Sequence, residues 1–313
     1  MERLLVTSLD TLVGSNLALA MADRCEVLGL YDRCELTTPS LRTACWHPDD
    51  TSTIGQHIDD WRPQWIVHTG PLSASSWQAP ACAIAAEREP AVVARLVEAA
   101  DRHGCRLTVI SSDAVFAGPR MFHDESSPAT SPAPAAAQGR AMERVLQRSN
   151  ALVVRTHAYG FGVDPEESGF AEWAFEALSS HAAPIGHVAD GRRHATPILA
   201  TDLAELLWPA YQAGLHGLYH VAGAERASPH RFIVEMAAAL GFCTPEGLTD
   251  DARPTPSWQE ETSLSSKRAR RKLAAATPLL REGLNRFAEQ AQNGWRAKWH
   301  RDGAPCGPIA VAA

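Results

Sequence analysis

An α/β fold with a doubly wound parallel sheet is predicted by the pattern of apolar residues. Short apolar runs of four to six residues alternate with amphipathic segments of ten to sixteen residues through the first half of the chain. This alternation is typical of βαβ units, in which helices cover both faces of a parallel sheet. A chain of 313 residues with 45% hydrophobic residues can also bury a substantial core. We therefore expect a Rossmann-type sheet followed by a smaller C-terminal region.

Each element has its own signal in the sequence. A short apolar run reads as a buried strand, and a longer segment with apolar residues three and four apart reads as a helix. Strands are expected at residues 4–7, 26–32, 64–70, 106–112 and 151–156, with helices at 12–24, at 89–104 and from about 135.

Beyond residue 156 the alternation loosens, which suggests a second region packed over one edge of the sheet. We assign residues 1–155 to the Rossmann-like domain, 156–292 to the smaller region, which is interleaved with the sheet, and 293–313 to a loosely held tail. In the second region, helices are expected near 168–180, 201–212, 229–241 and 278–291, with one strand at 217–223.

Composition and charge exclude several classes of protein. With 29 basic and 36 acidic residues the formal charge is −7, which is unfavourable for nucleic-acid binding. No stretch approaches the ~20 apolar residues that span a bilayer, and the N-terminus does not resemble a secretory signal. Seven single cysteines and 13 scattered histidines lack the spacing of disulfide frameworks or metal sites. We expect a cytoplasmic protein without metal, nucleic-acid or membrane partners.

The turn after the first strand bears on cofactor binding. It reads Val6-Thr7-Ser8-Leu9-Asp10-Thr11-Leu12-Val13-Gly14 and resembles the VTGxxGxxG turn of the extended short-chain dehydrogenase/reductase family. Ser8 and Thr11 stand where that family has its first two glycines, and only Gly14 is retained. The first glycine makes a tight turn and the second lets the backbone approach a pyrophosphate. We expect Ser8 to require a reshaped or strained turn and Thr11 to crowd the phosphates.

Further cofactor contacts are expected at the ends of the second and third strands. Asp32 lies where an acidic residue would bind the ribose hydroxyls of NAD, and Arg33 could instead pair with the 2′-phosphate of NADP. Alternatively, the two residues form a loop charge pair. His68 and Gly70 end the third strand at the same edge of the sheet. NAD or NADP binding is therefore possible, and we expect it to be weak.

The most specific resemblance follows the strand at 106–112. The stretch Ser111-Ser-Asp-Ala-Val-Phe-Ala-Gly118 is similar to the STDYVFDG stretch of the dTDP-4-dehydrorhamnose reductase branch of that family. The resemblance implies that Ser112 orients a carbonyl. It also places the proton-donating tyrosine of the family at Ala135 and its lysine at Gly139. No tyrosine occurs between residues 31 and 159, and no lysine before residue 267. His157 and Tyr159 are candidate substitute acids, or else packing residues.

The same resemblance suggests where a substrate would bind. Ser73 and Trp77 follow the third strand, and Trp77 could stack on a base or simply fill the core. Arg192 and Arg193 are adjacent, and paired guanidinium groups suit a diphosphate. A solvated basic turn is the alternative.

Three functions are compatible with these residues. The chain could have lost hydride transfer and bind a nucleotide or nucleotide-sugar, or regulate a partner enzyme, as a pseudoenzyme. It could be an active NAD(P)H-dependent nucleotide-sugar 4-keto reductase with a substitute proton donor. It could also be a structural interaction protein on the same fold, and a homo-oligomer is possible in each case. The loss of the tyrosine, the lysine and two glycines favours the first function.

Overall fold

Seven parallel strands form the central sheet of the computed structural model, in the order β10-β7-β6-β5-β1-β2-β4. The structure describes residues 1–33, 35–49, 51–78, 83–163, 169–180, 193–243 and 261–302. The order reverses between β1 and β5, as in doubly wound folds, and the predicted fold class is confirmed. The sheet strands are β1 (Glu2–Thr7), β2 (Cys25–Tyr31), β4 (Arg42–Cys45), β5 (Trp65–His68), β6 (Arg106–Ser112), β7 (Leu152–Thr156) and β10 (Gly217–His220).

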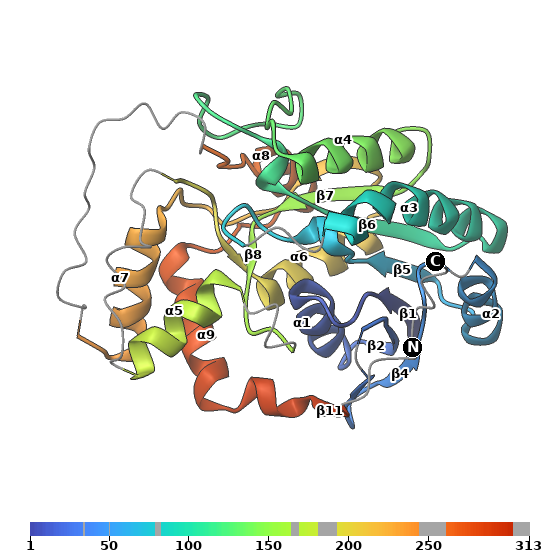
Figure 1. The fold of residues 1–313 in the computed structure, drawn as a ribbon, viewed down its shortest axis with the longest axis horizontal. Helices are drawn as coiled ribbons and strands as arrows, with labels where there is room; N and C mark the ends of the chain where they lie inside the picture. The colour runs from blue at the N-terminus through green and yellow to red at the C-terminus, as the bar shows by residue number, and fades with distance from the viewer. Residues whose placement is uncertain are drawn as a thin grey trace, which may run out of the picture.

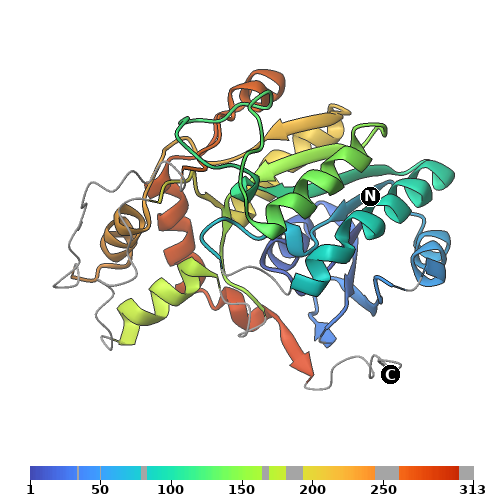
Figure 2. The same cartoon turned by 45° about the horizontal axis from the view of Figure 1, so that its top comes forward.

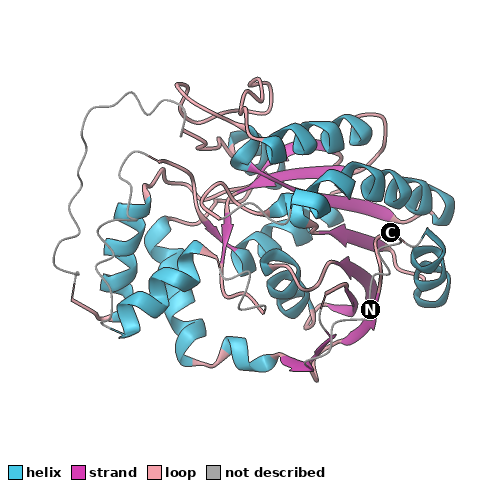
Figure 3. Cartoon of the chain, in the orientation of Figure 1, coloured by secondary structure: helices cyan, strands magenta, loops and turns pink. Residues whose placement is uncertain are grey.

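Helices cover both faces of the sheet (Figure 3). Side chains of β1 alternate between the two faces: Leu4 and Val6 pack into the core shared with α1 and α6, while Leu5 packs into the core shared with α2, α3 and α4. Both cores are apolar, which accounts for the continuous apolar runs in the sequence. The helices are α1 (Leu12–Met21), α2 (Thr51–Trp61), α3 (Ala83–His103), α4 (Pro134–Leu146) and α6 (Ala200–Gln212).

A third core holds the C-terminal helices together. Helices α5 (Phe170–Ser180), α7 (Pro229–Leu240) and α9 (Leu280–Gln292) gather on the side of the molecule away from α2 (Figure 1). Their contact is rich in aromatic residues, including Phe232 and Phe287. The Ser228 hydroxyl caps the start of α7, and Gly241 ends that helix with a left-handed φ of 73°.

The two regions of the chain share the sheet. β10 and α6 lie beyond residue 155, yet β10 pairs with β7 and α6 packs on α1. A short parallel pair joins β8 (Ala158–Tyr159) to β9 (Ile198–Leu199). The C-terminal region therefore completes the Rossmann sheet as well as covering its edge.

The chain after α9 returns to the first domain. The 3₁₀ helix η6 (Trp295–Lys298) leads to β11 (His300–Asp302), which pairs with β3 (Glu35–Thr37) in an antiparallel ladder (Figure 2). The indole of Trp295 donates a hydrogen bond to the Asn16 side chain at 2.9 Å. Part of the predicted tail is thus held against the sheet domain. No helix in the described ranges has the length and apolarity needed to cross a membrane.

Candidate functional site

The turn between β1 and α1 is closed by its own side chains. Ser8 has a φ of 56°, in the left-handed region that glycine favours, as expected for a residue in the first glycine position. Thr11 caps α1: its hydroxyl accepts a hydrogen bond from the Gly14 amide at 3.1 Å and donates one to the Ser8 carbonyl at 2.9 Å. A Cβ at Gly14 would collide with that carbonyl. Thr11 thus uses one of the amides that a helix start offers to an anion.

The charged residues near this turn are paired with one another. The buried Asp10 carboxylate accepts hydrogen bonds from the Arg33 backbone amide and from its Nε, both at 3.0 Å. Asp32 lies 3.4 Å from His47. Burial and the neighbouring Asp10 carboxylate raise the pKa of Asp32. Asp10 therefore holds the Arg33 guanidinium in place. Its carboxylate also places a negative charge beside the turn that a pyrophosphate would approach.

These contacts bear on whether the turn fits a dinucleotide. Thr11 fills the position where a glycine would let the backbone approach a pyrophosphate, and the Asp10 carboxylate would repel its charge. The residues present do not fit the diphosphate of NAD or NADP as a glycine turn does.

His68 belongs to a buried polar chain rather than to an open pocket. The Thr7 hydroxyl donates to its Nδ1 at 2.6 Å, and its Nε2 donates to Glu89 at 2.7 Å. A Cβ at Gly70 would collide with the Glu89 carboxylate, so glycine is required for this close approach. The buried Glu89 carboxylate is thus used by His68.

A second buried polar cluster lies where β6 and β7 end. His157 Nδ1 donates to Asp113 at 2.8 Å, and the hydroxyls of Ser76 and Thr262 donate to the same carboxylate at 2.7 and 2.5 Å. Although burial alone would raise it, the contacts with His157, Thr262 and Ser76 lower the pKa of Asp113. The Ser112 hydroxyl donates to Asp113 and accepts from the Ala114 amide. Ser112 is thus occupied as a cap of the short helix that follows.

Trp77 covers His157. The two rings meet edge to face with centroids 4.6 Å apart, and Trp77 also contacts Phe170 and Phe232 at 5.2 and 5.7 Å. The cavity among these rings has a volume of about 10 Å³, which is room for roughly one water molecule. The Trp77 Nε1 is buried there without a hydrogen-bond partner among the described residues. Trp77 therefore fills the space beside His157 in this structure.

Tyr159 points toward the C-terminal helices. Its hydroxyl lies 2.5 Å from the place that a Cβ on Gly283 would occupy, and it has no hydrogen-bond partner in the described part of the chain. Burial, together with the nearby Asp202 carboxylate, raises the pKa of Tyr159 well above its usual value. A phenol in this setting is a poor proton donor because its anion is strongly disfavoured.

The helix that would carry the tyrosine and lysine of the family is α4. Ala135 is partly buried against the core between α3 and α4. Gly139 is buried, and a Cβ there would lie 3.0 Å from the Val115 side chain. Neither position offers a group that could donate or hold a proton.

Behind the same strand ends lies a buried ion pair that sequence reasoning missed. Glu143 accepts two hydrogen bonds from Arg155, at 2.8 and 2.5 Å, and one from Ser111 at 2.8 Å. The Arg155 guanidinium also lies over the Phe116 ring, 4.8 Å from its centroid. An arginine inside the apolar strand at 151–156 was the available signal, since a buried charge requires a partner.

The predicted substrate residues are only partly brought together. Ser73 donates to the Thr69 carbonyl at 3.3 Å, so its hydroxyl is used within its own turn. Arg193 donates to the Ser76 carbonyl at 3.2 Å and therefore lies beside the Asp113 cluster. Arg192 lies outside the described residues.

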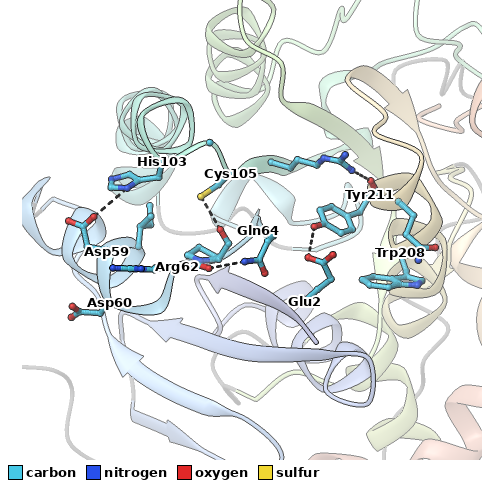
Figure 4. A pocket seen from close by; sticks show the side chains of 14 residues that line it. Glu2, Asp59, Asp60, Arg62, Gln64, His103, Cys105, Trp208 and Tyr211 are labelled. Atoms are coloured by element: carbon cyan, nitrogen blue, oxygen red, sulfur yellow. Dashed lines mark hydrogen bonds and ion pairs between the residues drawn. The ribbon is translucent and has the colours of Figure 1, made fainter.

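The largest described hollow lies at the opposite edge of the sheet, before β1, β5 and β6 begin (Figure 4). It has a volume of about 1150 Å³. Its polar groups pair with one another: Tyr211 donates to Glu2 at 3.0 Å, and His103 lies 3.3 Å from Asp59. Ligands of doubly wound sheets bind at the carboxyl ends of the strands, so this hollow is not the site expected for the fold. In the described ranges, no cluster of histidine, cysteine and carboxylate groups could hold a metal ion.

A known protein family matches most of the chain. A family model described as "RmlD substrate binding domain" matches residues 1–293. Comparison with curated proteins found no significant match.

Solved structures share the fold at low sequence identity. A dTDP-4-dehydrorhamnose reductase from Bacillus anthracis, in complex with NADP, has 19% identity and a TM-score of 0.70, covering 92% of this chain and 98% of that one. A hypothetical dTDP-4-dehydrorhamnose reductase from Sulfolobus tokodaii has 21% identity and a TM-score of 0.68, with 86% and 94% covered. A UDP-glucose 4-epimerase from Thermotoga maritima, with UDP-glucose, has 15% identity and a TM-score of 0.72, with 94% and 99% covered.

Proposed function

Since the chain belongs to the RmlD substrate binding domain family, we propose that it is a pseudoenzyme of that family, one that has lost hydride transfer. It would act by binding a nucleotide or nucleotide-sugar, or by regulating a partner enzyme. The observation that carries this proposal is the state of the proton-donor position. Helix α4 offers only Ala135 and Gly139 there, and the nearby His157 is bonded to Asp113 and covered by Trp77.

The cofactor turn supports the same conclusion. A general acid typically contributes 10²–10⁴-fold to a rate, so its loss alone slows a reductase severely. Thr11 and Asp10 add a second obstacle, because they occupy an amide and place a charge where the diphosphate of a dinucleotide would lie. The missing proton donor and the obstructed cofactor turn are independent changes. Together they would abolish hydride transfer while the fold is preserved.

The first experiment measures cofactor binding and turnover together. We expect calorimetry to give dissociation constants for NADH and NADPH far weaker than micromolar. We also expect no NAD(P)H oxidation with 4-keto nucleotide-sugars. Thr11→Gly combined with Ser8→Gly should strengthen dinucleotide binding, while Thr11→Ser, which keeps the capping oxygen, should not. NAD(P)H oxidation by the unaltered protein would contradict the proposal, whereas micromolar binding without turnover would contradict only the expected crowding of the turn by Thr11 and Asp10.

Nucleotide-sugar binding separates the two non-enzymatic functions. Several structures with this fold were solved with a nucleotide-sugar or nucleotide, such as the epimerase with UDP-glucose. A thermal-shift screen against dTDP- and UDP-sugars should raise the melting temperature if the strand-end site still binds them, because a ligand of the native state stabilises it. No shift with any nucleotide-sugar would favour a structural interaction protein.

An active reductase with a substitute acid is the second candidate, and one contact favours it. Asp113 accepts the Nδ1 proton of His157, which orients the ring and leaves Nε2 as the position that would hold the donated proton. Turnover that disappears in His157→Ala and persists in Tyr159→Phe would establish this alternative. Loss of turnover in Tyr159→Phe alone would assign the acid to Tyr159 instead.

A further inference from the structure

A groove beside α8 (Lys267–Leu273) has the features of a second ligand site, away from the strand-end cluster of Asp113 and His157. Figure 1 places α8 near the top of the molecule, next to α4 and the chain that precedes it. The groove has a volume of about 630 Å³, within the range usual for small-molecule sites. We call it the α8 groove. Among the residues that line it are the aromatic Phe122 and the cations Lys267, Arg270 and Arg271.

Helix α8 carries more positive charge than its own stability requires. Lys267, Arg268, Arg270, Arg271 and Lys272 are all exposed, in a protein whose net charge is −7. One or two cations in the last turn complement the helix dipole. Within the described ranges, no carboxylate lies at ion-pair distance from any of these five cations. The excess positive charge is therefore available to an external anion.

The carboxylates nearest to α8 do not line the α8 groove. Asp124 and Glu125 line an adjoining hollow, which shares Phe122, Lys267 and Arg271 with the α8 groove. Asp124 pairs with Arg120 at 2.9 Å, and Glu125 accepts the His220 amide at 3.0 Å. No described carboxylate lines the α8 groove itself, so an anion is best accommodated there.

An aromatic ring stands at the groove in a strained backbone conformation. Phe122 has a φ of 54°, and the residue is 43% exposed. Its amide donates to the Ser263 hydroxyl at 2.8 Å, which holds the residue in place. Non-glycine residues in this region of backbone conformation are strained, and such strain is concentrated at functional sites. An exposed phenyl ring held this way offers a stacking surface for a planar group.

One polar group of the groove lacks a partner. Thr277 is buried, and its hydroxyl makes no hydrogen bond with any described residue. The hydroxyl oxygen is itself covered by protein atoms, so it lies behind the groove wall and is not among the groups that a ligand would contact.

We propose that the α8 groove binds a nucleoside phosphate. Lys267, Arg270 and Arg271 would hold the phosphates, because guanidinium groups bind phosphate oxygens in a bidentate manner. The base would stack on Phe122. The site is independent of the proposed function at the strand ends.

Calorimetry with ADP, inorganic pyrophosphate and adenosine tests each part of the proposal. We expect ADP to bind, pyrophosphate to bind more weakly and adenosine not to bind. Lys267→Gln with Arg271→Gln should weaken ADP binding at least tenfold. Phe122→Ala should weaken ADP binding while leaving pyrophosphate binding unchanged. The conservative pair Lys267→Arg and Arg271→Lys should retain binding.

A matched control removes the same charge elsewhere. Arg102→Gln with Arg281→Gln changes two exposed cations on α3 and α9 and should leave ADP binding unchanged. ADP binding that survives in the Lys267 and Arg271 variant, with thermal unfolding unaltered, would place the ligand elsewhere and overturn the proposal. So would binding of hexaglutamate without binding of ADP, since α8 would then be a surface for an acidic protein. Equal loss in the control pair would show a nonspecific charge effect and would also overturn it.

Discussion

Replacing Ser8 by glycine should stabilise the protein, although the change removes a side chain from a buried turn. Ser8 has a φ of 56°, and a non-glycine residue in that region costs about 1–2 kcal/mol. Glycine avoids this cost and loses roughly 0.5–1 kcal/mol through the greater freedom of the unfolded chain. The Ser8 carbonyl, which accepts from Thr11 at 2.9 Å, is part of the backbone and is retained.

The net gain for Ser8→Gly therefore lies between about 0 and 1.5 kcal/mol, with a central value near 0.8 kcal/mol. In a chain of 313 residues the central value corresponds to an increase in melting temperature of roughly 1 °C, and the upper value to roughly 2 °C. Urea unfolding followed by circular dichroism measures the difference directly, and the slope of the transition should not change. Ser8→Ala is the matched control, because alanine removes the hydroxyl and keeps the strained backbone.

Two results would refute this reasoning. If Ser8→Gly lowers the free energy of unfolding, the Ser8 side chain contributes more than the strain costs. If Ser8→Ala stabilises the protein as much as Ser8→Gly does, the gain comes from removing the hydroxyl and not from relieving the backbone.

Three further predictions test the site. Trp77→Ala should destabilise the protein by about 3–5 kcal/mol, as for other buried aromatic residues. Added indole should bind the cavity that is left and restore part of the melting temperature. No response to indole would mean that the Trp77 side chain does not simply fill a cavity. Glu143→Gln should cost about 3–5 kcal/mol in urea unfolding, because it leaves the Arg155 charge buried and unpaired, and a loss below 1 kcal/mol would contradict this. The pKa of Asp113 is lower in the folded protein, so its contribution to stability is present above the unfolded pKa of about 4 and is lost as the pH falls further. Urea midpoints at pH 7 and pH 3 should therefore differ less in Asp113→Asn than in the unaltered protein, and an equal difference would show that His157 does not hold that carboxylate ionised.

The sequence by itself predicted the parallel sheet and the absence of the catalytic tyrosine and lysine. The apolar runs at 4–7, 64–70 and 151–156 became β1, β5 and β7, because a strand covered on both faces is apolar over most of its length. The absence of tyrosine and lysine around α4 is a matter of composition and needs no coordinates. The strain at Ser8 followed from the position of a non-glycine residue in a glycine turn, and the structure confirms it.

Other elements left too weak a signal in the sequence. β4 is four residues long, at an edge of the sheet, and partly exposed, so its residues lack a clear apolar pattern. β11 owes its conformation to pairing with β3, nearly the whole length of the chain away. Edge strands of this length depend on their partner for stability rather than on their own residues.

Only the tertiary structure decided which side chains meet at the strand ends. Asp113 directly follows an apolar strand and could have been suspected, but its partner Thr262 lies 149 residues away in the sequence. Trp77 could stack on a ligand or fill the core, and its contacts with His157 and Phe232 place it in the core. The periodicity of apolar residues along one segment indicates which residues face a core, because each buried position requires an apolar side chain independently of the others. The pairing of polar groups inside that core depends on strand order and on the paths of the loops, which no single segment encodes.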